Sequence, residues 1–350
     1  MLVHVVISII WLGVLAYAVF GGADFGSGAW DLLAGSSNRG ADVRHRIDRS
    51  IGPVWEANHV WLIFVLVFLW TGFPRVFAAL VTAVFIPMLG VGVGIIFRGG
   101  AFVFRKSSSS FEQARFFGAL FAVSSLVTPF FLGAAVGAVA SGRVRLDQPI
   151  DPWQVWMTPT SLLGGALAVG TCMWLAAVFL AADADRDGQP HLTAYFTRRS
   201  QITAVVLGMV SLVGIYVIES DASSLADGLE TWGAPLIVAS GACGLATMYL
   251  LARGRPQVAR VPAVGAVVSV LVGWGVGQYP WMLVDEIEIA DAATSSATLW
   301  ALVVAFALAV VLVIPSLFWL LRLTAEGALS TDQSRGDSSF ARLESLEGEH

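Results

Sequence analysis

The chain has 350 residues, of which 57% are hydrophobic and 13% are charged, and its mean hydropathy is +0.76. Soluble globular domains carry about 25% charged residues, so this composition excludes a soluble fold. The chain also holds 36 glycines and 13 tryptophans, residues that membrane helices tolerate or that anchor helix ends at the membrane surface. The formal net charge is -5, and residues 324–350, with six acids against two arginines, carry nearly all of it.

Nine apolar segments are long enough to cross ~30 Å of hydrocarbon, which takes about 20 helical residues. They are apolar on all faces, whereas the strands of a membrane barrel alternate apolar and polar residues. We therefore predict an all-α polytopic membrane protein, with a nine-helix transmembrane domain over residues 1–323 and an acidic, disordered cytoplasmic tail over 324–350. The first segment lacks the basic start and cleavage site of a signal peptide, so we expect it to be retained. The predicted spans are residues 2–20, 55–73, 76–97, 115–140, 156–181, 201–219, 233–252, 261–280 and 298–321.

The basic residues fix the expected orientation. With nine alternating spans, 17 of the 20 fall on one side and three on the other, which is the positive-inside pattern. The N-terminus is therefore expected outside and the C-terminus in the cytoplasm. Arg75, Arg143 and Arg145 lie outside, whereas Arg39, Arg44, Arg46, Arg49, Arg98, Arg105, Lys106, Arg115, Arg186, Arg198, Arg199, Arg253, Arg255, Arg260, Arg322, Arg335 and Arg342 lie inside.

The ends of the first and fifth spans resemble each other. Residues 19–24 read VFGGAD and residues 178–183 read VFLAAD, and both end an odd-numbered span on the cytoplasmic side. A duplicated four-helix unit, giving two four-helix bundles plus one helix, would explain this likeness of six residues.

Two carboxylates near the cytoplasmic ends of spans are candidate functional residues, because ionisable groups at membrane depth are costly and mark function. Asp24 follows span one among glycines that permit close backbone approach. Glu56 falls in the first turn of span two, after Pro53, which suits the first helical position.

Glu56 has two interpretations. As an anion at a helix N-terminus it would complement the helix dipole. Alternatively it shares a helix face with His59, beside Asn58 and at the membrane level of Asp24, which together could form a proton entry route. Burial raises the pKa of such a carboxyl whereas a helix N-terminus lowers it, so both interpretations stay open on these residues.

Tryptophans and arginines flank the same region. Trp55 and Trp61, like most of the other tryptophans, stand near predicted span ends and are typical of interfacial anchors. Arg98 and Arg105 bracket the third cytoplasmic loop. They either snorkel to the surface or pair with Glu56, Asp24, a quinone or a haem propionate.

The sequence offers metals and haem few ligands. The histidines are His4 at the outer end of span one, His45, His59 and His191 on the cytoplasmic side, and His350. A haem held by two histidines needs them at matched depth on facing helices, and no such pair is present in the sequence. The two cysteines lie in separate apolar segments and suggest neither a disulfide framework nor a metal cluster. We therefore expect no metal or haem ligated by this chain, and any redox cofactors on another subunit.

Four segments resemble subunit II of the cytochrome bd quinol oxidases. Residues 51–63, IGPVWEANHVWLI, are similar to the family's I-G/A-P-x-W-D-G-N-x-V-W-L-I, and the tryptophan-rich pattern is specific. Three further segments agree with it in order and spacing. They are GADFG at 22–26, the arginine-flanked loop of Arg98 and Arg105 at 97–105, and GWGVGQYP at 273–280, which contains Gln278 and Pro280.

The resemblance implies a heterodimer in a bacterial cytoplasmic membrane, formed with a larger subunit I that carries two haems b and one haem d and oxidises quinol at the outer face. In that family subunit II binds no haem, stabilises its partner, and contributes a cytoplasmic proton path through the carboxylate matched by Glu56. A bound quinone and a small accessory subunit also belong to the expectation. Here Glu56-Ala57 replaces the usual Asp-Gly, and His59 stands where Gln or Glu is frequent, so the chain resembles a divergent member.

Two other classes of function compete with a terminal oxidase that reduces O2 to water. In a proton-coupled secondary transporter, Asp24 and Glu56 would be coupling sites near the midplane between inverted repeats. Their place at the cytoplasmic edge counts against this class. In a purely structural membrane scaffold, the same acids would only complement helix ends.

Overall fold

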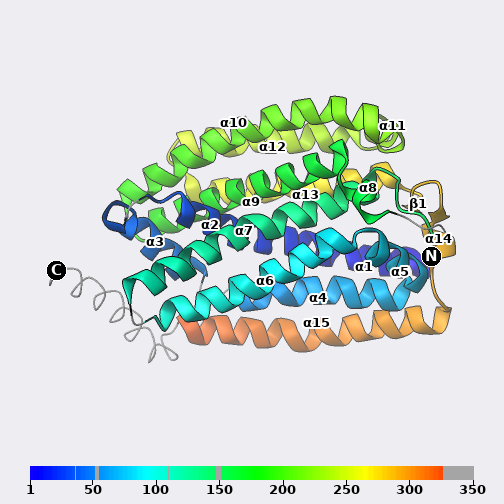
Figure 1. Ribbon diagram of the computed structural model, residues 1–350, viewed down its shortest axis with the longest axis horizontal. Coiled ribbons are helices and arrows are strands. Elements are labelled where there is room, and N and C mark those ends of the chain that lie inside the picture. The colour runs from blue at the N-terminus through cyan, green and yellow to red at the C-terminus, as the bar shows by residue number, and fades with distance from the viewer. Residues whose placement is uncertain (36, 52–54, 109, 147–150, 326–350) are drawn as a thin grey trace.

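The computed structural model describes the chain except for residues 36, 52–54, 109, 147–150 and 326–350. The side chains at 37–39, 51, 55–57, 106, 111, 314, 317–318 and 320–325 are also outside the described part. The described elements are helices that run back and forth along one direction, with a small two-stranded sheet at the end of the bundle that holds the N-terminus (Figure 1). The predicted tail over 324–350 lies almost entirely outside the described residues.

The first helical run is longer than the predicted span at 2–20. Helix α1 (Leu2–Ala16) continues through a π-helical segment, η1 (Tyr17–Gly21), into α2 (Gly22–Leu32). The whole run is 31 residues long and counts as one candidate membrane span. Asp24 therefore lies within the helical run and not after it. Single π-helical turns are frequent at functional sites.

Among the next helices, the long ones α4, α6 and α7 run back and forth between the two ends of the bundle (Figure 1). Proline opens α5 at its first position, where its missing N–H leaves no hydrogen bond unmade. Ser110 caps α7 by accepting a hydrogen bond from the Gln113 N–H. The elements are α3 (Ser37–Ile51), α4 (Trp55–Gly72), α5 (Pro74–Ala83), α6 (Phe85–Lys106) and α7 (Phe111–Ala140).

The second half begins with two capped helices. Asp151 and Thr158 each precede a proline at the first helical position and accept a hydrogen bond from a backbone N–H of the first turn. The elements are α8 (Pro152–Trp156), α9 (Pro159–Arg186), α10 (Pro190–Asp221), α11 (Ser223–Thr231), α12 (Ala234–Ala252), α13 (Pro256–Gln278), β1 (Trp281–Leu283), β2 (Ile287–Glu288), α14 (Ile289–Ala292) and α15 (Ser296–Ala325), with β1 antiparallel to β2.

Eight helical runs within the described residues are long and apolar enough to cross a membrane. The second predicted span corresponds to α4, whose apolar part, Asn58–Gly72, is shorter; a total of nine spans stays a prediction. The third predicted span, 76–97, differs from the structure, because a break at Val84 separates α5 from α6 and the spanning helix is Phe85–Arg105.

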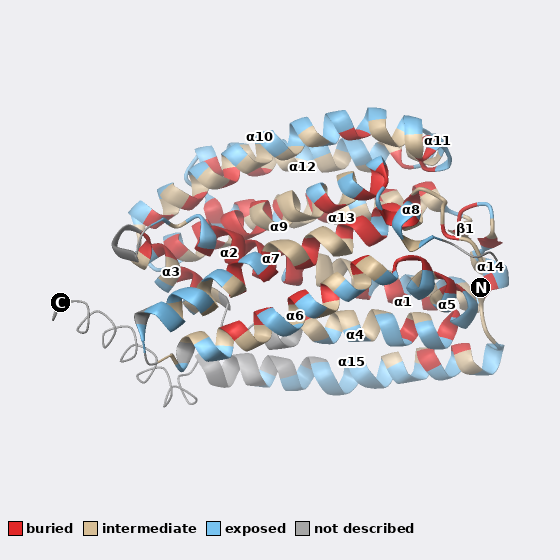
Figure 2. Ribbon diagram, viewed as in Figure 1, coloured by how far each residue is buried: buried red, intermediate tan, exposed pale blue. Residues whose placement is uncertain are grey.

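Helix α9 lies in the middle of the bundle, and its second half is almost fully buried (Figure 2). It packs against α2, α7, α10 and α13. By contrast, α10, α12 and α15 present large apolar side chains outward, such as Leu212, Val238 and Val311, each about two-thirds exposed or more. In a membrane this outer surface faces lipid or a partner subunit.

Candidate functional site

Asp24 is buried where α2 approaches α9 most closely. A Cβ on Gly26 would stand 1.9 Å from the carbonyl oxygen of Cys172, and one on Gly28 would stand 2.2 Å from the Ser125 hydroxyl oxygen. Only glycine permits these contacts, as the sequence predicted for the glycines around Asp24. The Asp24 residue is 5% exposed.

Arg98 of α6 pairs with Asp24. The two terminal nitrogens of Arg98 donate to the two carboxylate oxygens at 2.7 and 2.9 Å, and Nη2 also donates to the Asp24 carbonyl oxygen at 3.2 Å. Its Nε donates to the Ser125 hydroxyl at 2.9 Å. The guanidinium lies between the rings of Phe25 and Phe121, with Cζ 4.8 Å from each ring centroid. Arg98 is 2% exposed.

This geometry decides between the two interpretations of Arg98. Its side chain does not snorkel to the surface but pairs with Asp24, as the alternative predicted. Two-pronged hydrogen bonds between a guanidinium and a carboxylate are among the stronger side-chain contacts in proteins. Because the pair is buried, loss of one partner would leave the other charge uncompensated. Asp24 is therefore tied to Arg98 through both its carboxylate and its backbone carbonyl oxygen in this structure.

A second ion-pair group lies two helical turns beyond the first, because Asp31 follows Asp24 and Arg105 follows Arg98 by seven residues. Asp31 of α2 accepts from Arg105 at 2.6 Å and pairs with Arg44 at 3.2 Å. Arg105 also contacts Asp48 at 3.5 Å. Arg44 and Asp48 belong to α3, so this group attaches the polar helix α3 to α2 and α6. The sequence singled out Arg105 but not its partners.

The beginning of α4 reaches the same region. The Glu56 and Trp55 side chains lie outside the described residues. Asn58 is 2% exposed, and its Nδ2 donates to the carbonyl oxygen of Phe20 at 3.3 Å, which brings the first turns of α4 beside η1. His59 is half-buried. Trp61 is half-buried with its ring edge-on to Phe64, at 6.4 Å between centroids.

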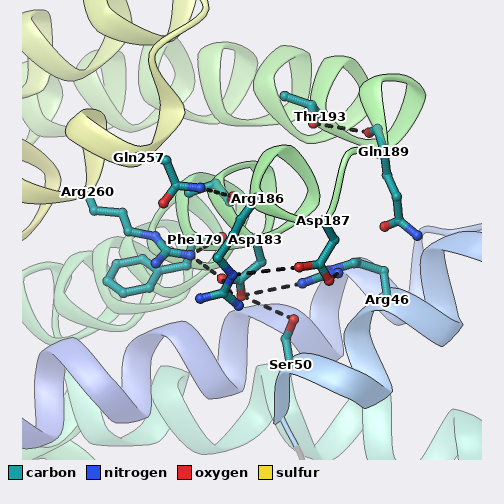
Figure 3. A network of polar contacts seen from close by, with 11 residues as sticks. Arg46, Ser50, Phe179, Asp183, Arg186, Asp187, Gln189, Thr193, Gln257 and Arg260 are labelled. Carbon is teal, nitrogen blue, oxygen red and sulfur yellow. Dashed lines mark hydrogen bonds and ion pairs between the residues drawn. The ribbon is translucent and has the colours of Figure 1, made fainter. Parts of the chain in front are cut away.

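A third network centres on Asp183 at the end of α9 (Figure 3). Asp183 accepts from Arg260 of α13 and from the Ser50 hydroxyl of α3 at 3.2 Å, and it contacts Arg186 at 3.3 Å. The Arg260 guanidinium stacks over Phe179 at 5.1 Å and donates to that residue's carbonyl oxygen at 3.0 Å. The likeness of residues 178–183 to 19–24, read from the sequence only as a possible duplication, could have pointed to this site, because Asp183 stands where Asp24 does and each aspartate takes an arginine.

Arg46 extends this network into α3. Its guanidinium pairs with Asp187 and lies 3.9 Å from Asp183, and the residue is 4% exposed. The hydrogen bond from Arg46 holds the pKa of the Asp187 carboxyl below its ordinary value. Sequence reasoning used Arg46 only to set the orientation of the chain. In the structure it attaches α3 to α9, as Arg44 and Asp48 attach it to α2 and α6.

The GWGVGQYP segment lies at the opposite end of the bundle, away from Asp24 and Arg98 (Figure 1). The Trp274 indole donates to Gln278 Oε1 at 2.9 Å, and Gln278 Nε2 donates to the Met282 carbonyl oxygen at 3.1 Å. The Tyr279–Pro280 peptide bond is cis. Gln278 thus joins the end of α13 to β1. Four of the predicted site residues, Asp24, Arg98, Arg105 and Asn58, converge at the other end.

Possible metal ligands are scattered in the described part of the chain. No group of three or more His, Cys, Asp or Glu residues there could hold a metal ion. The described histidines lie on α1, α3, α4 and α10. His350 and the other residues of the tail lie outside the described residues, so this statement about metal ligands does not cover them.

Residues 2–324 match the family model described as cytochrome bd terminal oxidase subunit II. The chain belongs to this family. It is 20% identical over 329 residues to the putative cytochrome bd menaquinol oxidase subunit II of Bacillus subtilis (strain 168), covering 90% of this chain and 93% of that protein. It is 28% identical over 225 residues to the cytochrome bd-I ubiquinol oxidase subunit 2 of Escherichia coli (strain K12), covering 61% of this chain and 56% of that protein.

The fold agrees with the family. The bd oxidase structure from Geobacillus thermodenitrificans matches with a TM-score of 0.77 at 24% identity, over 92% of this chain and 98% of that one. The chain is thus a subunit of a cytochrome bd quinol oxidase, a quinol:O2 oxidoreductase complex, and a multi-pass protein of a bacterial inner membrane. The resemblance stated from residues 51–63 and the three further segments is confirmed, and the low identities fit a divergent member.

Proposed function

We propose that this chain is the haem-free subunit of the oxidase: it stabilises a larger haem-bearing subunit I and supplies a cytoplasmic proton path. The match of residues 2–324 to the subunit II family carries the proposal. The two haems b and the haem d would lie on the partner, where quinol is oxidised and O2 is reduced to water. The ligand chemistry of this chain supports that division, because its described histidines are dispersed over separate helices.

The proposed orientation places the N-terminus outside and the ends of α2, α6 and α9 at the cytoplasmic face. The 17-to-3 division of basic residues supports it. Reduction of O2 to water consumes protons, and quinol oxidation releases them. If the protons for O2 reduction are taken from the cytoplasm and the protons of quinol are released outside, a membrane potential forms without proton pumping.

Glu56 would be the proton relay, with Asn58 and His59 beside it. The Asn58 bond to the Phe20 carbonyl oxygen supports this role, because it brings the start of α4 to the buried polar junction of α2 and α6. Asp24, held by its ion pair with Arg98, would be the neighbour of Glu56 along this path.

The proton role can be tested in the assembled oxidase with Glu56→Gln. We expect slower quinol-driven oxygen consumption with unchanged haem absorption. The glutamine keeps the size of the side chain, but its amide cannot take up and release a proton as a carboxyl does. Glu56→Asp should recover part of the rate. Asp42→Asn, at a 77% exposed side chain of α3, is the control for removing a cytoplasmic carboxylate. Unchanged turnover in Glu56→Gln would contradict the relay, and lost haem would indicate an assembly role instead.

A further inference from the structure

Arg199 on α10 is an exception among the arginines of this chain. Every other arginine that the structure describes as buried or half-buried pairs with a carboxylate, as Arg98, Arg46 and Arg260 do. Arg199 is half-buried and makes no ion pair with any carboxylate in the described part of the chain. A guanidinium that is partly removed from water is costly unless an acceptor replaces the lost hydration.

Two aromatic rings hold this guanidinium in place. The Arg199 Cζ lies 4.9 Å from the ring centroid of Tyr195 and 5.7 Å from that of Trp30. The Trp30 ring is itself fixed, because its indole N–H donates to the Met173 carbonyl oxygen at 2.8 Å. Stacking satisfies the faces of a guanidinium but not its N–H groups, which lie in its plane. The donors of Arg199 are therefore oriented but unused by the described protein.

Further donors near this place also lack acceptors. The Tyr195 hydroxyl is buried and has no hydrogen-bond partner. The Ser200 hydroxyl of α10 and the Trp174 indole N–H of α9 are likewise buried and unpartnered, with the two residues 0% and 4% exposed. Buried polar groups in proteins nearly always find a partner. The N–H groups of the half-buried Arg199, in contrast, can be reached from outside the bundle, and they suit a ligand that accepts hydrogen bonds and is negatively charged.

The position along α10 identifies the source of such a ligand. Arg199 is nine residues after the helix start at Pro190, about 14 Å along the axis, and the apolar run predicted at 201–219 begins just beyond it. This is the depth of lipid phosphates on the side that carries most of the basic residues. Helix α10 lies at the edge of the bundle, where lipid can reach it (Figure 1).

We propose that Arg199 binds the phosphate group of an anionic phospholipid in the cytoplasmic leaflet. The planar guanidinium donates to two phosphate oxygens at once. Trp30 and Tyr195 form the walls that keep the guanidinium from reorienting. The site is separate from the proposed proton route at α4 and does not depend on it.

The test compares Arg199→Gln with Arg198→Gln in the purified oxidase complex. Arg198 is the exposed neighbour and loses the same charge, so it reports general electrostatic attraction. Each complex is reconstituted in nanodiscs of phosphatidylcholine with a minor fraction of phosphatidylglycerol, extracted in mild detergent, and weighed intact with its retained lipid. We expect Arg199→Gln to retain roughly tenfold less phosphatidylglycerol than the wild type, and Arg198→Gln to retain it as the wild type does.

Tyr195→Phe provides a further control that keeps the ring stacked on Arg199 and removes only the hydroxyl. Because this buried hydroxyl has no protein partner, its loss should leave thermal stability of the lipid-free complex unchanged or higher, and lipid retention as in the wild type. Equal retention in wild type and Arg199→Gln would overturn the proposal, as would equal losses in both arginine variants. Displacement of the lipid by inorganic phosphate at millimolar concentration would also overturn it, because the site would then be one for free phosphate. Loss of haem with unchanged lipid would assign Arg199 to a carboxylate of the partner subunit and overturn it as well.

Discussion

Arg98 and Asp24, 74 residues apart in the sequence, form a two-pronged ion pair that joins α6 to α2 inside the bundle. Both residues are at least 95% buried, and the arginine is also held by Ser125 and by two phenylalanine rings. A pair of this kind stabilises the packing only while both charges are present.

Removal of one partner should therefore be more harmful than removal of both. We expect Arg98→Gln or Asp24→Asn alone to destabilise the subunit by about 3–5 kcal/mol, because each leaves a buried charge without its counterion. The double variant should recover part of this loss. Thermal unfolding of the oxidase complex, followed by haem absorption, measures the effect; a double variant as unstable as the sum of both single variants would contradict it.

Gly26 should not tolerate alanine. Its Cβ would meet the backbone carbonyl of Cys172 at 1.9 Å, and a backbone group in a packed helix cannot move aside cheaply. We expect Gly26→Ala to cost about 1–3 kcal/mol or more. Gly92→Ala on α6 is the matched control, because a Cβ there meets nothing within 4 Å, and it should be neutral or stabilise by up to about 1 kcal/mol. The unfolding midpoints of the two variants decide the comparison.

Glu286 should make stability depend on acidity at the end of the bundle that holds the sheet. The Arg145 hydrogen bond at 2.8 Å, together with the Leu146 N–H at 3.2 Å, lowers the pKa of Glu286 below its ordinary value of 4.5. A carboxyl with a depressed pKa in the folded state contributes stability above its unfolded pKa, and that contribution is lost as the pH falls through the folded pKa.

Glu286→Gln tests this dependence directly. The wild type should be more stable than the variant at pH 7, and the difference in unfolding midpoint should shrink as the pH falls below about 4.5. A difference that stays constant or grows with acidification would show that the Arg145 pair does not contribute.

Gln278 should hold the end of α13 to the small sheet. Its side chain accepts from Trp274 and donates to the Met282 carbonyl oxygen. Gln278→Met keeps the length of the side chain and removes both hydrogen bonds, so we expect a loss of about 1–3 kcal/mol. Because this residue is far from the proposed proton path, oxygen consumption per haem should change little. Turnover that falls in proportion to assembled haem fits this role, whereas a fall per haem would assign Gln278 to catalysis.

The sequence predicted the membrane helices well because hydropathy reports burial in lipid directly. It misplaced the third span because residues 76–97 are apolar throughout, so the break at Val84 leaves no trace in the hydropathy. Pro87, in the first turn of α6, was the available signal, since proline is tolerated there and not further into a helix.

The candidate site was predicted only in part. The Asp24–Arg98 pair was one of two open interpretations, because both residues lie at similar predicted depth. The partners of Arg105 and the whole Asp183 network were missed, since α3 reads as a polar loop and its packing against α2 and α9 depends on tertiary contacts. The unpartnered Arg199 could not be told from an ordinary cytoplasmic arginine without the surrounding rings.

The visible absorption spectrum of the complex purified through this chain tests the central claim, that the chain is subunit II of a bd oxidase whose haems lie on its partner. We predict haem b and haem d bands in a complex that consumes oxygen with quinol, and loss of all of these bands from this chain once the larger subunit is removed. A complex without haem, or haem that stays bound to this chain after that separation, would contradict the account.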